Sequence, residues 1–184
     1  HQGNERAFWN NTGIDACRWV IDLNRKNFPA REHAFHVVDA RELVWWTPDS
    51  FDVVYLRELL EHLPEYEKAL SEAIRVAKHE VMVVFFIPPT EGNDEIKLDE
   101  CDGVELFHNH WNKKRLEEFV TQRGCQFNWV PLDDKRVLFR VYKGGRKDEA
   151  AGNDSGGMSR ERPAVPEQSA PELPEPERGA DRSG

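Results

Sequence analysis

Cysteine and long apolar runs are scarce in this chain of 184 residues, and basic residues are outnumbered by acidic ones. The three cysteines, Cys17, Cys101 and Cys125, form no CxxC pair, which argues against a disulfide framework and against a Cys-rich zinc site. No apolar run approaches the ~20 residues that a membrane-spanning helix needs. The formal net charge of -9 disfavours a broad electrostatic surface for nucleic acid.

Glycine is also rare in the first part of the chain, where Gly3 and Gly13 are the only ones before residue 90. The GxGxxG turn, with which dinucleotide-binding folds approach a pyrophosphate, is therefore missing. Its absence argues against an NAD-dependent dehydrogenase. No secretory signal is visible, but the chain reads as if it begins partway through a domain, so this absence carries little weight. Cytoplasmic is the default expectation.

The last part of the chain differs in composition from the rest. Residues 144–184 contain five of the eleven prolines and no aromatic residue. Such a segment cannot bury enough apolar surface to offset the entropy lost on ordering. We therefore predict a disordered tail over 144–184 and a folded domain over residues 1–143.

The hydrophobic pattern of the domain predicts strands and helices in alternation. The predicted strands are 12–16, 34–38, 51–56 and 80–87, and the predicted helices are 17–28, 57–63, 65–78 and 112–123. Trp19, Val20 and Leu23 are predicted to face the core from the first helix. Residues 90–110 show little pattern and are predicted to form a connection. Two β-rich runs at 126–130 and 136–142 predict an antiparallel hairpin.

This order predicts an α/β fold with a doubly wound, mostly parallel sheet and a C-terminal antiparallel hairpin. In such sheets, ligands bind beyond the carboxyl ends of the strands. Asp15, Asp39 and the segment after Leu56 follow predicted strands at those ends. These residues are therefore the first candidates for a binding site.

Six segments occur in a particular order and spacing: TGIDA at 12–16, VVDAREL at 37–43, FDVVYLRELLEHLP at 51–64, KALSEAIRVAK at 68–78, EVMVVFFIPP at 80–89 and HNHWNKKRLEEFVTQRGC at 108–125. Together they resemble the class I S-adenosylmethionine-dependent methyltransferases, most closely the type 11 group. The resemblance implies a Rossmann-like methyltransferase fold with S-adenosyl-L-methionine as cofactor.

The family's first strand and the Gly-rich turn after it have no counterpart in these segments. Residues 1–11 read like the remainder of the helix that follows that turn. We expect the first strand to be missing from between the strands at 12–16 and 51–56. Either the strand and turn lie upstream of His1, which we favour, or the protein has dispensed with its cofactor loop.

The resemblance also assigns cofactor-binding roles. Asp15, with Ala16, would accept hydrogen bonds from both ribose hydroxyls, and Asp39, with Ala40, from the adenine amino group. From the residues alone, Asp15 could instead cap the following helix, and Asp39 could be a turn aspartate. The weaker candidates for an apolar wall beside the adenine ring are Leu43, Val44, Trp45 and Trp46.

Leu56 and Arg57 occupy the segment that passes beside the transferred methyl group in the family. The letters YLRE there differ from the DPPY or NPPY motif of some DNA and protein methyltransferases. Nitrogen methylation of DNA bases by that route is therefore disfavoured.

Glu58, Glu61 and His62 are the candidate catalytic residues. Their spacing of i, i+3, i+4 would place all three on one face of a helix. With His108 or His110 they could hold a divalent ion, and ExxEH resembles the metal site of small-RNA 2'-O-methyltransferases. Because metal-free type 11 members carry LEHLP here too, we assign no metal and favour His62 as an acceptor-pocket residue or general base.

The sequence thus predicts a methyltransferase acting on a small-molecule acceptor, with no nucleic-acid or membrane partner. Two alternatives stay open. One is a metal-assisted RNA ribose 2'-O-methyltransferase. The other is a non-catalytic methyltransferase-like fragment or binding module.

Overall fold

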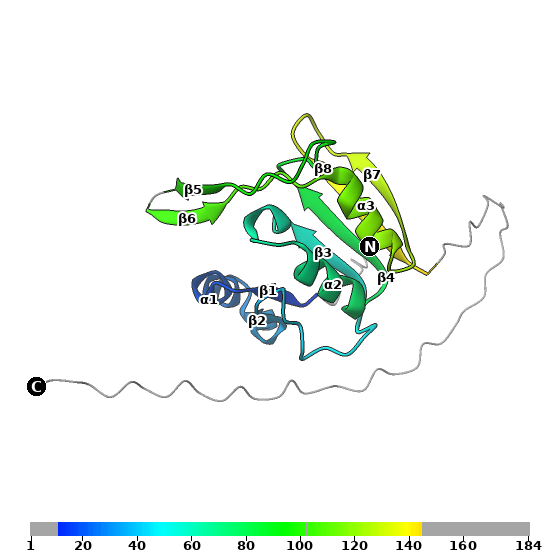
Figure 1. Cartoon of the computed structure of the whole chain (residues 1–184). Coiled ribbons are helices and arrows are strands. Elements are labelled where there is room, and N and C mark those ends of the chain that lie inside the picture. Colours follow the sequence, from blue (N-terminus) through cyan, green and yellow to red (C-terminus); the bar gives the residue numbers. More distant parts are fainter. Residues whose placement is uncertain (1–10, 102, 145–184) are drawn as a thin grey trace, which may run out of the picture. The chain divides into compact units, whose positions relative to one another are not determined.

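The computed structural model describes residues 11–101 and 103–144. Its first unit is a strand–helix–strand crossover (Figure 1): β1 (Gly13–Asp15), α1 (Arg18–Asn27), the 3-10 helix η1 (Pro29–Ala34) and β2 (Phe35–Val37). The two strands pair in parallel, with Asp15 opposite Val37. The predicted order of strand, helix and strand is confirmed.

A second sheet has four strands in the order β3 (Phe51–Arg57), β4 (Ala77–Phe85), β8 (Val137–Lys143) and β7 (Cys125–Pro131). β3 and β4 are parallel and are connected through α2 (Glu67–Val76). β8 pairs antiparallel to both β4 and β7, so the predicted C-terminal hairpin is confirmed. Gly124, which has a φ of 73°, ends the preceding helical segment.

Within the described ranges, no strand pairs with β3 on the edge away from β4, and none joins β3 to the β1–β2 sheet. The loop between β2 and β3 links the two sheets instead. The Trp46 ring packs against His36 and Phe51, at centroid distances of 5.9 and 5.7 Å. One aromatic side chain therefore stands between the strand ends of the two sheets.

The core lies on one face of the four-stranded sheet, under α2 and α3 (Lys113–Thr121) (Figure 1). Leu70, Leu116, Phe85 and Phe139 are fully buried there. Tyr66 joins the two helices, because its ring packs edge-on against Trp111 and Phe119. This cluster supplies most of the apolar burial in the described part of the chain.

The buried face of α1 was predicted wrongly. Ile21 is 1% exposed, whereas Trp19 is 70% and Leu23 is 40% exposed. The guanidinium of Arg25 donates to the carbonyl oxygen of Phe35 at 2.6 and 3.1 Å, which holds the side of the helix with Ile21 against β2. A single long-range contact thus sets the rotation of the helix.

The boundary between α2 and β4 also differs from the prediction. The helix ends at Val76 and the strand begins at Ala77, although the helix was expected to reach Lys78 and the strand to begin at Glu80. Lys143 Nζ donates to the carbonyl oxygens of Arg75 and Ala77 at 3.2 and 3.0 Å. This side chain from the last strand satisfies carbonyls at the helix end, a partner that local sequence cannot reveal.

The connection over 90–110 is not unstructured. It forms an antiparallel hairpin from β5 (Leu98–Cys101) and β6 (Val104–Phe107), with Gly103 at a φ of 78° in the turn. Figure 1 shows the hairpin projecting from the rest of the domain. Its acidic residues hide the alternation that would otherwise predict strands.

Two predictions fall outside the described ranges: the helical remainder over residues 1–10 and the disordered tail from residue 145 onward. Among the helices that the structure describes, none is long and apolar enough to cross a membrane.

The core predicts a clear stability contrast between two leucines. Leu70→Ala removes a fully buried side chain and should lower the free energy of unfolding by about 2 to 5 kcal/mol, as measured by urea denaturation. Leu132→Ala, at a side chain that is 47% exposed, should change it by less than about 0.5 kcal/mol. Equal losses in the two variants would contradict this location of the core.

Candidate functional site

Asp15 and Asp39 lie at the same edge of the β1–β2 sheet. Asp15 is the last residue of β1, and Asp39 follows β2 by two residues. The backbone N–H of Val38 donates to the carbonyl oxygen of Asp15 at 3.0 Å, so the parallel pairing continues to the strand ends. Both aspartates therefore stand at the carboxyl edge, where α/β sheets bind ligands.

Asp15 does not occupy the N-cap position of α1, which belongs to Cys17. Instead, its Oδ1 accepts a hydrogen bond from the backbone N–H of Cys17 at 2.7 Å. No described residue donates to its other carboxylate oxygen. The turn thus holds the carboxylate in place and leaves acceptor capacity at the sheet edge.

Asp39 is clamped by Arg41. The guanidinium donates to both carboxylate oxygens, with the shortest distance 2.6 Å, and the Arg41 backbone N–H donates to Oδ1 at 2.8 Å. The hydrogen bonds from the guanidinium lower the pKa of Asp39 below its ordinary value. Asp39 is therefore an anionic acceptor, and a ligand amino group would share it with Arg41.

The neighbouring candidates divide between the surface and the core. Ala16 is exposed, and the Arg57 side chain is 62% exposed beside Glu58. Leu56 is buried in the core cluster, and Ala40 packs against that cluster. Leu56 and Ala40 can therefore reach a ligand at the sheet edge mainly through their backbone.

The segment proposed as an adenine wall is similarly divided. Leu43 is buried, Trp46 packs between the two sheets, and Val44 and Trp45 are exposed. Glu72 and Arg75 of α2 hold the loop. Glu72 Oε2 accepts from the Leu43 backbone N–H at 2.9 Å, and Arg75 donates to the carbonyl oxygens of Leu43 and Trp46 at 2.8 and 2.7 Å.

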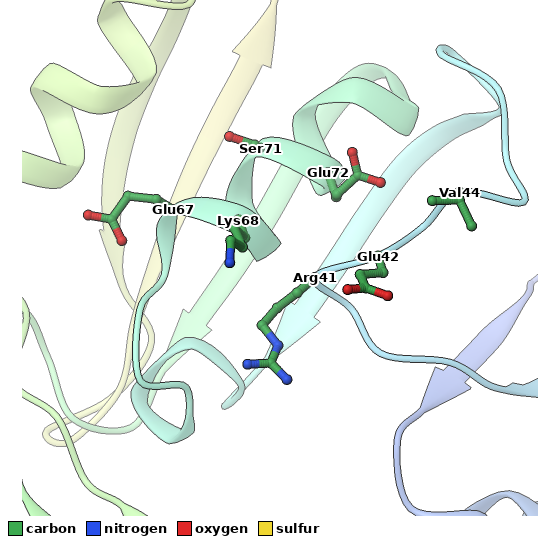
Figure 2. Close-up of a pocket in the computed structure, with 7 residues that line it drawn as sticks. All are labelled: Arg41, Glu42, Val44, Glu67, Lys68, Ser71 and Glu72. Atoms are coloured by element: carbon green, nitrogen blue, oxygen red, sulfur yellow. The ribbon is translucent and has the colours of Figure 1, made fainter.

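A cavity of about 390 Å³ lies between this loop and the outer side of α2 (Figure 2). Figure 2 shows charged side chains from both segments around it. The lining residues are Arg41, Glu42, Val44, Glu67, Lys68, Ser71 and Glu72. Charged side chains of both signs line it, and Val44 is the one apolar residue among them.

The predicted helix over 57–63 is mostly absent. The expectation that the three catalytic candidates share one face of a helix is therefore wrong. Arg57 ends β3, Glu58 has a left-handed φ of 50°, and only Leu60–His62 form a 3-10 turn, η2. Glu58, Glu61 and His62 are therefore not displayed on one helical face. Among the described residues, no group of three or more His, Cys, Asp or Glu is arranged to hold a metal ion.

Glu61 is turned into the core and is 0% exposed. Its Oε1 accepts from the backbone N–H of Phe86 at 2.8 Å, and its carbonyl oxygen accepts from the N–H of Asn109 at 3.0 Å. No described residue donates to Oε2, and burial raises the pKa of the carboxyl group. Glu61 thus ties η2 to the end of β4, and it does not face a ligand.

His62 keeps its place as a site candidate. Its Nδ1 lies 2.7 Å from the carbonyl oxygen of Phe107, and its ring packs on Phe86 at a centroid distance of 5.4 Å. Because a carbonyl only accepts, Nδ1 carries the proton and Nε2 keeps its lone pair. The imidazole therefore presents a basic nitrogen near the carboxyl end of β4.

Sequence reasoning missed the buried Asn109, which is 0% exposed. Its side chain accepts from the backbone N–H of Lys97 at 3.0 Å and donates to the carbonyl oxygen of Leu63 at 2.7 Å. It thereby joins the β5–β6 segment to η2. A polar residue in the apolar-poor run HNHWN carries no periodic signal that would have identified it.

Comparisons with known proteins agree with this fold. A family model described as "Methyltransferase domain" matches residues 2–85. No curated protein matches the chain closely enough to count as a relative.

Solved structures with the same fold share little sequence with the chain. The PH0226 protein of Pyrococcus horikoshii OT3 has a TM-score of 0.55 and 19% identity, covering 72% of this chain and 70% of its own. The [4+2]-cyclase SpnF has a TM-score of 0.55 and 15% identity over 72% and 65%. The magnesium protoporphyrin IX methyltransferase of Synechocystis PCC 6803, with bound SAM, has a TM-score of 0.50 and 12% identity over 72% and 59%.

The fold is that of the class I methyltransferases. The match over residues 2–85 identifies this stretch as part of a methyltransferase domain, a family whose cofactor is S-adenosyl-L-methionine. The described residues fit the nucleoside half of that cofactor, because Asp15 and Asp39 are acceptors at one sheet edge. Those residues include no glycine-rich turn for the methionine half.

The burial of Glu61 predicts how stability depends on pH. A raised pKa means that the folded state binds the proton more tightly than the unfolded state. The free energy of unfolding should therefore fall as the pH rises from the pKa of the unfolded state, about 4.3, to the pKa of the folded state. The fall amounts to about 1.4 kcal/mol for each unit by which the two pKa values differ. Glu61→Gln keeps an acceptor for Phe86 and should remove this part of the decline, as measured by urea denaturation across pH 4 to 9.

Two further variants make that measurement specific. Glu61→Ala leaves the Phe86 N–H buried without its acceptor, and should be less stable than Glu61→Gln by about 1 to 3 kcal/mol at every pH. Glu118→Gln, at a side chain that is 55% exposed, should follow the wild-type profile. If Glu61→Gln also followed that profile, Glu61 would not be titrating in a buried site.

Proposed function

We propose that this chain transfers a methyl group from S-adenosyl-L-methionine to a small-molecule acceptor at the carboxyl edge of its strands. The observation that carries the proposal is the placement of Asp15 and Asp39 at the ends of two paired parallel strands. In this arrangement Asp15 accepts hydrogen bonds from the ribose hydroxyls, and Asp39 accepts from the adenine amino group. Ala16 and Ala40, which follow the two aspartates, contact the nucleoside.

The methyl-bearing end of the cofactor would then lie toward the segment after β3. Leu56 and Arg57 line its path, and the Glu58 N–H is bonded to the carbonyl oxygen of Val84 at 2.8 Å. The left-handed backbone of Glu58 is uncommon for a residue with a side chain, and such conformations cluster at functional sites. We assign Glu58 and His62 to the acceptor pocket, and Glu61 to holding that pocket together.

The charge of the chain supports a small-molecule acceptor over nucleic acid. A net charge of -9 would repel a phosphate backbone, which nucleic-acid enzymes contact through Lys and Arg. The metal-assisted RNA ribose methyltransferase gains no support either, because Glu61 is buried and bonded to backbone. Methyl transfer itself requires mainly that the acceptor be aligned behind the sulfonium.

A non-catalytic module with the same fold is the remaining rival. The cyclase among the structural neighbours illustrates that this fold alone does not determine the reaction. Cofactor binding separates the two proposals, since a module that has lost its function need not bind the methyl donor or its product.

Calorimetry of the full-length protein with S-adenosylhomocysteine tests the proposal. We expect binding, and we expect Asp15→Asn to weaken it by about tenfold to a hundredfold, because charge-assisted hydrogen bonds to the ribose are lost. Asp52→Asn, at a side chain that is 83% exposed near the start of β3, should bind like the wild type. Absence of binding in the wild-type protein would favour the non-catalytic module.

A further inference from the structure

His108 is held by Asp99, and neither residue has a role in the function proposed above. His108 Nδ1 lies 2.9 Å from Asp99 Oδ2, between the end of β6 and the middle of β5. Hydrogen bonds from Lys97 and from His108 lower the pKa of Asp99, so the carboxylate is an acceptor. Nδ1 of His108 therefore carries the proton, and Nε2 keeps a basic lone pair.

His62 meets His108 from the other side of the site. Their ring centroids are 5.3 Å apart, and Phe86 packs against both, at 5.4 Å from His62 and 6.2 Å from His108. Because Nδ1 of each imidazole is occupied by an acceptor, the basic nitrogen of both rings is Nε2. Two such rings, from segments that are distant in the sequence, meet at the carboxyl end of β4.

We propose that His108 is the general base of the methyl transfer, that Asp99 is its positioning residue, and that the acceptor is a hydroxyl group. The inference rests on the proposed function. An alcohol or phenol must lose its proton as it is methylated, whereas an uncharged amine attacks without a base. A histidine oriented by a carboxylate supplies what a hydroxyl acceptor requires.

The transfer balances without a further reactant. A lone pair of the hydroxyl oxygen attacks the methyl carbon, and the carbon–sulfur bond breaks with its electrons passing to sulfur. The hydroxyl proton moves to Nε2 of His108, and the resulting imidazolium is balanced by Asp99. The positive charge of the sulfonium thus leaves as a proton, which His108 afterwards releases to water.

A purely structural role for the same contacts would be to fasten the β5–β6 hairpin to η2. The two roles differ in their electrostatics. A base must lie close to the sulfonium, so its ring ¹⁵N resonances should respond to the positive charge that S-adenosylmethionine carries and S-adenosylhomocysteine lacks. The titratable groups that face His108 are Asp99, with its partner Lys97, and His62.

NMR of the ¹⁵N-labelled imidazoles in the full-length protein tests this. We expect the Nδ1–H tautomer for His108, and ring ¹⁵N shifts that differ between the S-adenosylmethionine and S-adenosylhomocysteine complexes, because only the first compound carries the sulfonium charge. Asp99→Asn should weaken the preference for that tautomer in both complexes, and His108→Gln assigns the resonance. His79, which lies near Asp52 in the first half of β4, is the control and should give the same shifts with both compounds.

The outcomes separate the two proposals. If both compounds bind and the ring ¹⁵N shifts of His108 are the same with each, the base assignment is overturned while the proposed function stands. If neither compound binds, the proposed function itself fails.

The acceptor class is tested with small phenols and alcohols, alongside the same scaffolds carrying an amine. We expect methyl ethers, and a fall in kcat of about 100-fold to 10,000-fold for His108→Gln on the hydroxyl compounds. Asp99→Asn should move the pH profile of kcat on the hydroxyl compounds. Products from the amines alone would overturn the hydroxyl assignment.

Discussion

The buried carboxylate of Glu61 is the interaction on which the arrangement of the site depends. It binds the backbone of Phe86 at the end of β4, while its own backbone binds Asn109 beyond the β5–β6 hairpin. Three segments that are distant in sequence therefore converge on one residue. If the Glu61 carboxylate moved away, the backbone N–H of Phe86 would be left without a partner in the core. The carboxylate is therefore held firmly in place.

His62 and His108 owe their meeting to this convergence. Glu61 fixes η2, which carries His62, and Asn109 fixes the segment that carries His108. The Phe86 ring follows directly from the strand whose end Glu61 binds. A residue that looks catalytic in the sequence thus acts by placing two imidazoles, one of which the sequence left unassigned. Whether Glu61 contacts a reactant or positions its neighbours depends on the direction of its side chain, which is turned into the core.

Several errors of sequence interpretation share a cause in contacts between distant residues. The face of α1 is set by Arg25 bonding to β2, and the end of α2 by Lys143 from the last strand. The turn after β3 departs from a helix at Glu58, whose backbone bonds to Val84 of β4. Helical spacing places Glu58, Glu61 and His62 together only if the helix exists. Periodicity detects local conformation, and these features are decided by partners elsewhere in the chain.

The sequence by itself determined the order of strands and helices, the two edge aspartates and the resemblance to a methyltransferase. These follow from hydrophobic periodicity and from residues that stand at strand ends, both of which are local properties of the chain. Only the tertiary structure decided that Glu61 is buried, that Asp39 shares its carboxylate with Arg41, and that Asp99 orients His108. Burial and hydrogen-bond partners depend on which distant segments come together, and that information is absent from any single stretch of residues.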